Sequence, residues 1–148
     1  MSELVENSII NNLIAIYPLL SKSFAKQMRK TTSIGIGPLY IIGLLFRNGI
    51  MSMSEISRRL SMSKPHVTAH VDRLIADGLA HRLYDEKDRR VINIELTPAG
   101  SEQFIRVRQN VSDDMRCHLQ LLNDGQQEAL LQATHTVHDY VYSVINSK

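Results

Sequence analysis

The chain has a single cysteine, Cys117, and this excludes an internal disulfide framework. The sequence also lacks a Gly-rich phosphate loop, a Gly-x-Ser-x-Gly elbow and a His-Glu-x-x-His pair, so common signatures of nucleotide-binding, hydrolytic and zinc-dependent enzymes are missing. The uncharged span 31–46 falls short of the roughly twenty residues that cross a bilayer. These absences predict a protein that is not an enzyme, needs no cofactor or metal and has no membrane partner.

The start of the chain carries Glu3 and Glu6 and shows no signal peptide, lipidation or export motif, which predicts a cytoplasmic location. With 148 residues, of which 43% are hydrophobic, we expect one compact domain that is mainly α with a small β element (α+β). The formal net charge is only +2. Because no segment is a bulk basic patch, affinity for a polyanion would depend on the placement of a few cations.

Two short helices are predicted in the middle of the chain. Ser52 and Glu55 have the spacing of a capping box, in which Ser52 accepts from the amide of Glu55 and the Glu55 carboxylate reaches back to the cap. After a three-residue interruption, Ser63 offers a second N-cap, and Pro65 falls in the first turn, where its missing N–H costs nothing. Helix, short turn and helix form a helix-turn-helix arrangement.

The second helix has one apolar side and one polar side. Its apolar positions at helical spacing are Val67, Val71, Leu74 and Ile75. Short hydrogen-bonding groups near its start and a cation further along suit DNA base edges, thymine methyl groups and then backbone phosphate. An ordinary surface helix, the alternative, would more often alternate Glu and Lys. The polar-side residues that we predict to contact DNA are Ser63, Lys64, Pro65, His66, Thr68, Ala69, His70 and Arg73.

A β-hairpin is predicted directly after these helices. The strands 81–84 and 91–96 flank a tip, 85–90, that holds three acids, three bases and no apolar residue. Such a tip cannot fold back onto a core, so it projects into water or onto a partner. Adjacent Arg89 and Arg90 suit a narrow minor groove, whose negative potential favours an inserted guanidinium. A solvated turn with internal ion pairs is the alternative.

Three sets of residues within 52–100 carry a resemblance to a known family. They are Val71-Asp72-Arg73-Leu74 with Asp77-Gly78-Leu79, then Asp85-x-x-Asp88-x-Arg90, then Leu96-Thr97-x-x-Gly100. With them the segment resembles the winged helix-turn-helix of the MarR family of transcriptional regulators. The resemblance covers about a third of the chain, and the flanks match in layout rather than in motif.

The resemblance implies a DNA-binding function and a role for particular residues. It implies that Arg90 enters the minor groove, that Asp88 orients it, and that the face from Lys64 to Arg73 binds the major groove. We add Lys87 and Arg89 of the same tip to the expected DNA contacts. It further implies a homodimer on a near-palindromic operator in double-stranded DNA, more often as a repressor. The alternative function is a winged helix that binds protein without specific DNA binding.

The resemblance also implies a regulatory ligand. The family often places a small aromatic or phenolic effector between its dimerisation region and its DNA-binding domain. Tyr17, Tyr40 and Phe46 are the candidate effector-binding residues, with core packing as the alternative for each.

The flanks of the winged segment are predicted to be helical. In the region 1–36 apolar residues repeat at helical spacing, and Pro18 predicts a kink or two abutting helices, followed by a linker at 31–37. Pro38 then opens an apolar helix at the start of the DNA-binding region 37–100.

The region 101–148 holds two further helices. The first of them is capped by Thr97 with Pro98 at its first position, and the last begins after a cap at Asn123. The terminal helices are too apolar to remain uncovered, so we expect 1–36 and 101–148 to be dimerisation regions, with packing only on each other as the alternative.

Four side chains near the C-terminus could serve in redox sensing or metal binding. Cys117 is either a small apolar filler or a redox sensor. His118, His135 and His138 are either surface histidines or, together with this thiol, ligands of a metal ion.

Overall fold

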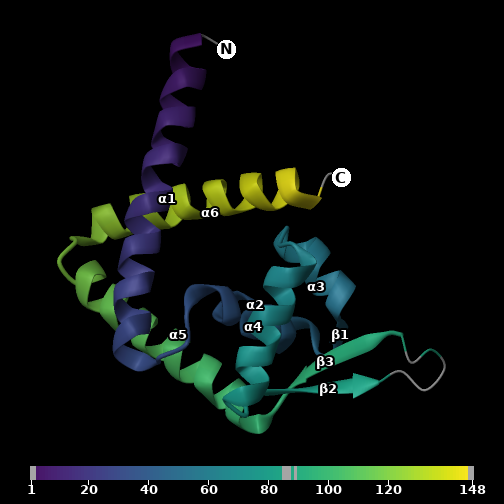
Figure 1. The fold of residues 1–148 in the computed structure, drawn as a ribbon. Coiled ribbons are helices and arrows are strands. Elements are labelled where there is room, and N and C mark those ends of the chain that lie inside the picture. Colours follow the sequence, from purple (N-terminus) through teal and green to yellow (C-terminus); the bar gives the residue numbers. More distant parts are fainter. Residues whose placement is uncertain (1–2, 85–87, 89, 147–148) are drawn as a thin grey trace. The chain divides into compact units, whose positions relative to one another are not determined.

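The computed structural model describes residues 3–84, 88 and 90–146 of the chain (Figure 1). The chain divides into two compact units, Met1–Val111 and Ser112–Lys148, with the boundary inside a helix. The elements in chain order are α1 (Glu3–Thr31), α2 (Ile36–Asn48), β1 (Met51–Ser52), α3 (Met53–Leu60), α4 (Lys64–Ala76), β2 (Ala80–Tyr84), β3 (Ile92–Leu96), α5 (Pro98–Leu119) and α6 (Asp124–Asn146).

The helix-turn-helix pair α3 and α4 forms as the sequence predicts, with two differences at its caps. Ser52 Oγ accepts from the backbone amide of Glu55 at 3.2 Å, but the Glu55 carboxylate pairs with Arg59 at 2.8 Å instead of reaching back. A charged partner one turn later is available to it, so only half of the capping box is confirmed. Ser63 is the N-cap residue of α4 but makes no side-chain cap bond. Pro65 removes one of the two amides that could donate to Ser63, so the N-cap is confirmed by position but not by a side-chain bond.

The small sheet has three strands in the order β1-β3-β2, all antiparallel. The predicted hairpin is β2 and β3, with Arg82 opposite Ile94, and on the other side of β3 the same Ile94 pairs with Met51 of β1. The predicted hairpin is thus confirmed, and β1 is an additional strand. A two-residue strand is too short to show a period in the sequence.

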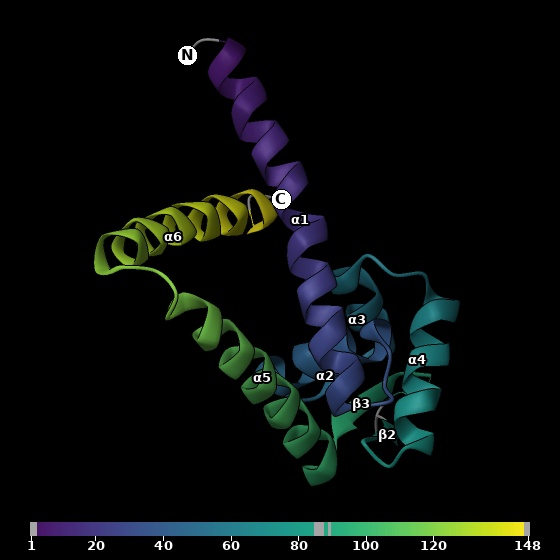
Figure 2. The same cartoon turned by 90° about the vertical axis from the view of Figure 1, so that its left-hand side faces the viewer.

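The core of the first unit lies between this sheet and helices α2, α3 and α4 (Figure 2). The apolar side of α4 faces it, as predicted, with Ile75 only partly buried, and β3 contributes its central residue. The largest fully buried side chains are Ile41, Ile42, Ile56, Leu74, Ile94, Val67 and Val71. Burial of each such side chain contributes about 1.5–3 kcal/mol, so this core fixes the position of α4.

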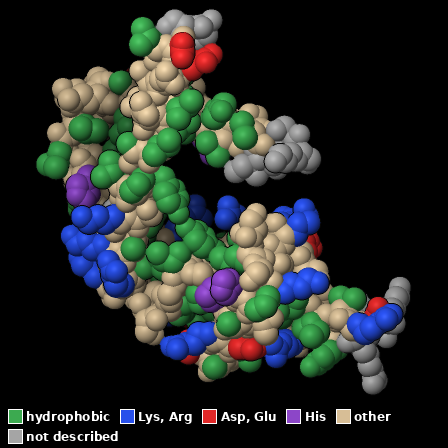
Figure 3. All heavy atoms as spheres, turned by 45° about the horizontal axis from the view of Figure 1, so that its top comes forward, with side chains coloured by type: hydrophobic (Ala, Val, Ile, Leu, Met, Phe, Trp, Pro, Cys, Tyr) green, Lys and Arg blue, Asp and Glu red, His purple; other side chains and the backbone are tan. Residues whose placement is uncertain are grey.

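Helix α1 is one continuous helix, so the alternative of two abutting helices at Pro18 is wrong. A proline removes one backbone bond, and twelve or more residues on each side hold the helix together. Its end is anchored in the first unit: Met28 is buried, and Asn110 of α5 donates to Thr31 Oγ1 at 2.8 Å. Upstream its apolar side chains are exposed, Leu4 and Leu19 most of all, and Figure 3 shows hydrophobic side chains along this helix.

Helix α2 begins before the proline that was predicted to open it. Ile36 is already helical, so the linker is only residues 32–35 and Pro38 is the third helical residue. Proline is tolerated throughout a first turn because those amides have no intrahelical partner. This places Gly37 inside α2 rather than in the linker.

The second unit contains the end of α5 and all of α6. The predicted cap at Asn123 is confirmed: its side chain accepts from the amide of Gln126 at 2.9 Å, and the Gln126 side chain accepts from the amide of Asn123 at 3.1 Å. Helix α6 exposes large apolar side chains, among them Leu131, Tyr140 and Val144. In residues 3–84, 88 and 90–146, no helix is long and apolar enough to cross a membrane.

Candidate nucleic-acid interface

Helix α4 presents most of the predicted DNA-contacting side chains to solvent. The exposed residues of this set are Ser63, Lys64, Pro65, His66, Thr68, Ala69 and Arg73. The Thr68 hydroxyl donates to the Lys64 carbonyl at 2.9 Å, and Arg73 Nε pairs with Asp77 at 2.8 Å. Because Arg73 is anchored at the end of the helix, its guanidinium is directed away from the first two turns. His66 and Ala69 are thus the central side chains of the exposed face.

His70 differs from the rest of this set because it is half-buried. Its imidazole lies against Gly37 in the first turn of α2, where a Cβ atom on Gly37 would come within 3 Å of three ring atoms. The ring therefore contacts protein on one flank of the exposed face. Sequence analysis had no signal for this contact, which joins residues far apart in the chain.

The other flank of α4 is tied to the sheet. Asp72 Oδ1 accepts a hydrogen bond from Arg82 Nη2, and Arg82 lies on β2. The ion pair joins α4 to the wing. Both residues are outside the predicted contact set, although Asp72 belongs to one of the motifs that carry the family resemblance.

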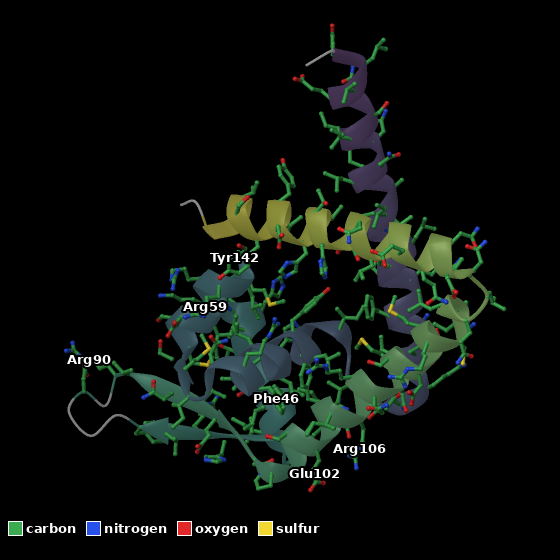
Figure 4. The ribbon with its side chains drawn as sticks, turned by 180° about the vertical axis from the view of Figure 1, so that it is seen from behind. Phe46, Arg59, Arg90, Glu102, Arg106 and Tyr142 are labelled. Atoms are coloured by element: carbon green, nitrogen blue, oxygen red, sulfur yellow. The ribbon has the colours of Figure 1, made fainter. Side chains whose placement is uncertain are left out.

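The wing carries Arg90 two residues before the start of β3. Its side chain is 92% exposed, and Figure 4 shows it projecting from the end of the ribbon. Asp88 Oδ1 accepts from both the backbone amide of Arg90, at 3.0 Å, and its Nε, at 3.1 Å. These two bonds lower the pKa of Asp88 below its ordinary 3.8, the backbone bond contributing most, so the carboxylate is charged at neutral pH. Asp85, Lys87 and Arg89 of the predicted tip lie outside the described residues.

The candidate effector residues are not brought together by ring contacts in the described chain. Phe46 packs on Phe104 of α5 with ring centroids 4.9 Å apart. Tyr17 on α1 is 69% exposed and Tyr40 on α2 is 52% exposed. Phe104 was not among the predicted residues, and its partner Phe46 has the packing role that was its alternative.

The thiol and the histidines near the C-terminus belong to the second unit. Cys117 is a free, exposed cysteine. His118 lies beside Asp114, and His138 contacts Asp139 and stacks on Tyr142. Among the side chains that the structure describes, no group of three His, Cys, Asp or Glu residues is placed to hold a metal ion.

Comparison with known proteins decides the family. A model of the MarR family matches residues 39–92, the stretch from α2 to the start of β3. The HTH-type transcriptional repressor MdtR of Bacillus subtilis (strain 168) is 31% identical over 126 residues, which cover 84% of this chain and 77% of that protein. The chain belongs to the MarR family. This MarR-family chain is a transcriptional regulator, and both the resemblance and the predicted winged helix-turn-helix are confirmed.

Solved structures agree with this MarR-family fold. The YusO protein from Bacillus subtilis is 26% identical, with a TM-score of 0.71 over 97% of this chain and 99% of that chain. A MarR family protein from Bacillus stearothermophilus, 20% identical, superposes with a TM-score of 0.82 over 96% of this chain and 99% of that one. NadR, solved in complex with 4-hydroxyphenylacetate, is 21% identical with a TM-score of 0.72 over 95% of this chain and 94% of that chain. The relatives named here as regulators are not enzymes.

Proposed function

We propose that this MarR-family regulator is a homodimeric repressor that binds a palindromic operator. Helix α4 enters the major groove, and Arg90 enters the adjacent minor groove of the same half-site. The observation that carries the proposal is Arg90 itself. A guanidinium that is 92% exposed beyond a paired β-ribbon, and aligned by Asp88, is available to a narrow groove of negative potential.

The exposed face of α4 supports base contacts rather than phosphate contacts alone. Pro65 and Ala69 form a short apolar strip that suits thymine methyl groups, and His66 beside it offers a ring nitrogen to a base edge. Lys64 at the start of the helix is placed for backbone phosphate. A helix used only for protein binding would have no need for such a mixture of small, polar and cationic side chains at its first turns.

A second copy of the chain is the proposed partner of the exposed apolar helices. Helix α1 exposes Leu4, Ile14 and Leu19, and helix α6 exposes Leu131 and Tyr140. Contiguous apolar helix surface of this kind marks an interface. In a two-fold dimer, one interface buries the exposed apolar surfaces of both copies. The same symmetry allows two α4 helices to bind the two half-sites of a palindrome.

We also propose control by a small aromatic or phenolic ligand. The support is a MarR-like neighbour solved with 4-hydroxyphenylacetate, together with the exposed rings of Tyr17 and Tyr40. Such a ligand lowers operator affinity only by its differential binding to two states of the dimer. Titration of 4-hydroxyphenylacetate into a preformed complex with DNA tests this, and release of DNA at saturating ligand is the expected result. An unchanged affinity for DNA excludes this ligand as an effector.

Fluorescence anisotropy tests DNA binding itself. The wild type and His66→Ala are titrated onto a labelled duplex from upstream of the chain's own coding region, and onto a scrambled duplex of equal composition. We expect the wild type to prefer the first duplex and His66→Ala to lose much of that preference, by roughly tenfold for one good base contact. Equal binding of both proteins to both duplexes would favour the alternative function, a winged helix that binds protein.

A further inference from the structure

The backbone conformation at Gly37 does not require a glycine. It lies in the first turn of α2, and the positive φ angles of the described glycines occur instead at Gly49 and Gly78. Any residue could adopt its backbone conformation, and an alanine there would favour the helix. The reason for the glycine is therefore the space beside it.

That space is filled by His70. A Cβ on Gly37 would lie 2.6 Å from His70 Cε1 and 2.9 Å from Cδ2, with Nε2 closer still. Contacts of this length do not occur between real atoms, so a methyl group on Gly37 would require the His70 ring to move. Gly35, two residues earlier, is the natural contrast, because a Cβ there would meet only Pro38 Cδ at 3.9 Å.

The imidazole is placed where α2 and α4 meet, and Figures 1 and 2 show these helices side by side. His66 and Arg73 are its neighbours one turn away on the exposed side of α4. If the ring left Gly37, the side chain would move towards these DNA-facing residues. While it packs on Gly37, the His70 ring stays off the exposed face of α4 and contacts α2 on one flank of that helix. The Asp72–Arg82 pair connects the other flank to β2.

We propose that His70 is a positioning residue for DNA recognition, and that Gly37 is the seat that fixes its imidazole. The contact sets the rotation of α4 against the start of α2, directly after the linker 32–35. The inference depends on the proposed DNA-binding function, and it replaces a direct DNA contact for His70 with a contact inside the protein.

The test compares Gly37→Ala with the matched control Gly35→Ala, in the full chain, by anisotropy on two duplexes. The first duplex is the one that the wild type enriches most strongly from a random-sequence library, and the second is its scrambled version. We expect Gly37→Ala to weaken binding to the enriched duplex at least tenfold and to leave the scrambled duplex within twofold, whereas Gly35→Ala resembles the wild type on both.

The double variant Gly37→Ala/His70→Ala identifies the imidazole as the cause. Removing the ring relieves its conflict with the new methyl group, so the double variant should bind the enriched duplex at least threefold better than Gly37→Ala alone. The proposal is overturned if Gly37→Ala binds the enriched duplex as tightly as Gly35→Ala does. It is also overturned if the double variant is weaker than Gly37→Ala by the same factor by which His70→Ala is weaker than the wild type. A wild type that enriches no sequence refutes the proposed function instead, and the two failures are thereby distinguished.

An NMR measurement on the free protein covers the case in which Gly37→Ala does not fold. In the wild type, a nuclear Overhauser effect between the His70 ring protons and the Gly37 Hα protons is expected, because the ring lies over that backbone. Its absence in a folded wild-type protein overturns the proposal without any DNA measurement.

Discussion

Replacing Arg90 by alanine should change DNA binding without changing the stability of the protein. The side chain is 92% exposed and its described partner Asp88 is a surface carboxylate two residues away, so the fold loses almost nothing. Each subunit loses one guanidinium from the DNA interface, and a dimer loses two. The effect should therefore appear as weaker binding and as a smaller dependence on salt.

The size of this change follows from counterion release. Each neutralised phosphate contributes about 0.9 to the slope of log affinity against log salt concentration, so two lost contacts reduce the slope by about 1.8. The ratio of wild-type to Arg90→Ala affinity should then change about 12-fold between 50 and 200 mM salt. Anisotropy titrations across that range measure both slopes directly.

Arg106→Ala is the charge-matched control. Figure 4 shows Arg106 on α5 and Arg90 at the end of the wing, on separate parts of the first unit. The control should keep the wild-type slope. The minor-groove role of Arg90 is refuted if the two variants show equal slopes, or if Arg90→Ala binds as tightly as the wild type at every salt concentration.

Three further substitutions test individual contacts by urea unfolding, two in the first unit and one, at Gly125, in the second. Gly100→Ala would press a methyl group against the backbone carbonyl of Leu79, and overpacking of this kind costs about 1–3 kcal/mol; unfolding at the wild-type urea midpoint would contradict that close approach. Gly125→Ala meets nothing closer than 3.5 Å and should raise stability by about 0.5 kcal/mol, so a destabilised variant would show an unrecognised contact. Arg82→Ala breaks the partly exposed pair with Asp72, so a loss of no more than about 1 kcal/mol is expected together with weaker specific DNA binding; unchanged DNA binding would argue against a role of the pair in orienting α4.

Sequence reasoning succeeded where the signal is local. The apolar stripe of α4 and the cap at Asn123 each depend on residues a few positions apart, and each is confirmed. It failed where another residue competes. Glu55 pairs with Arg59 instead of with its cap, and Pro65 removes one of the two amides that could donate to Ser63.

The remaining features are long-range and left no trace in the sequence pattern. Strand β1 has two residues, too few for a period, and is formed by its partner β3. The contact of His70 with Gly37 joins residues from different helices, so no local pattern in the sequence could predict it. The wing beyond β2 was recognised by motif, and of its predicted DNA contacts only Asp88 and Arg90 lie among the described residues.

Selection from a random-sequence duplex library tests the central claim most directly, because it assumes no operator. If two copies of α4 and two wings bind one duplex, the wild type should enrich an inverted repeat whose half-sites are separated by about one helical turn, roughly 10 base pairs from centre to centre. Enrichment of a single unpaired half-site would contradict the dimeric arrangement. Recovery of no common sequence would contradict specific DNA binding by this chain.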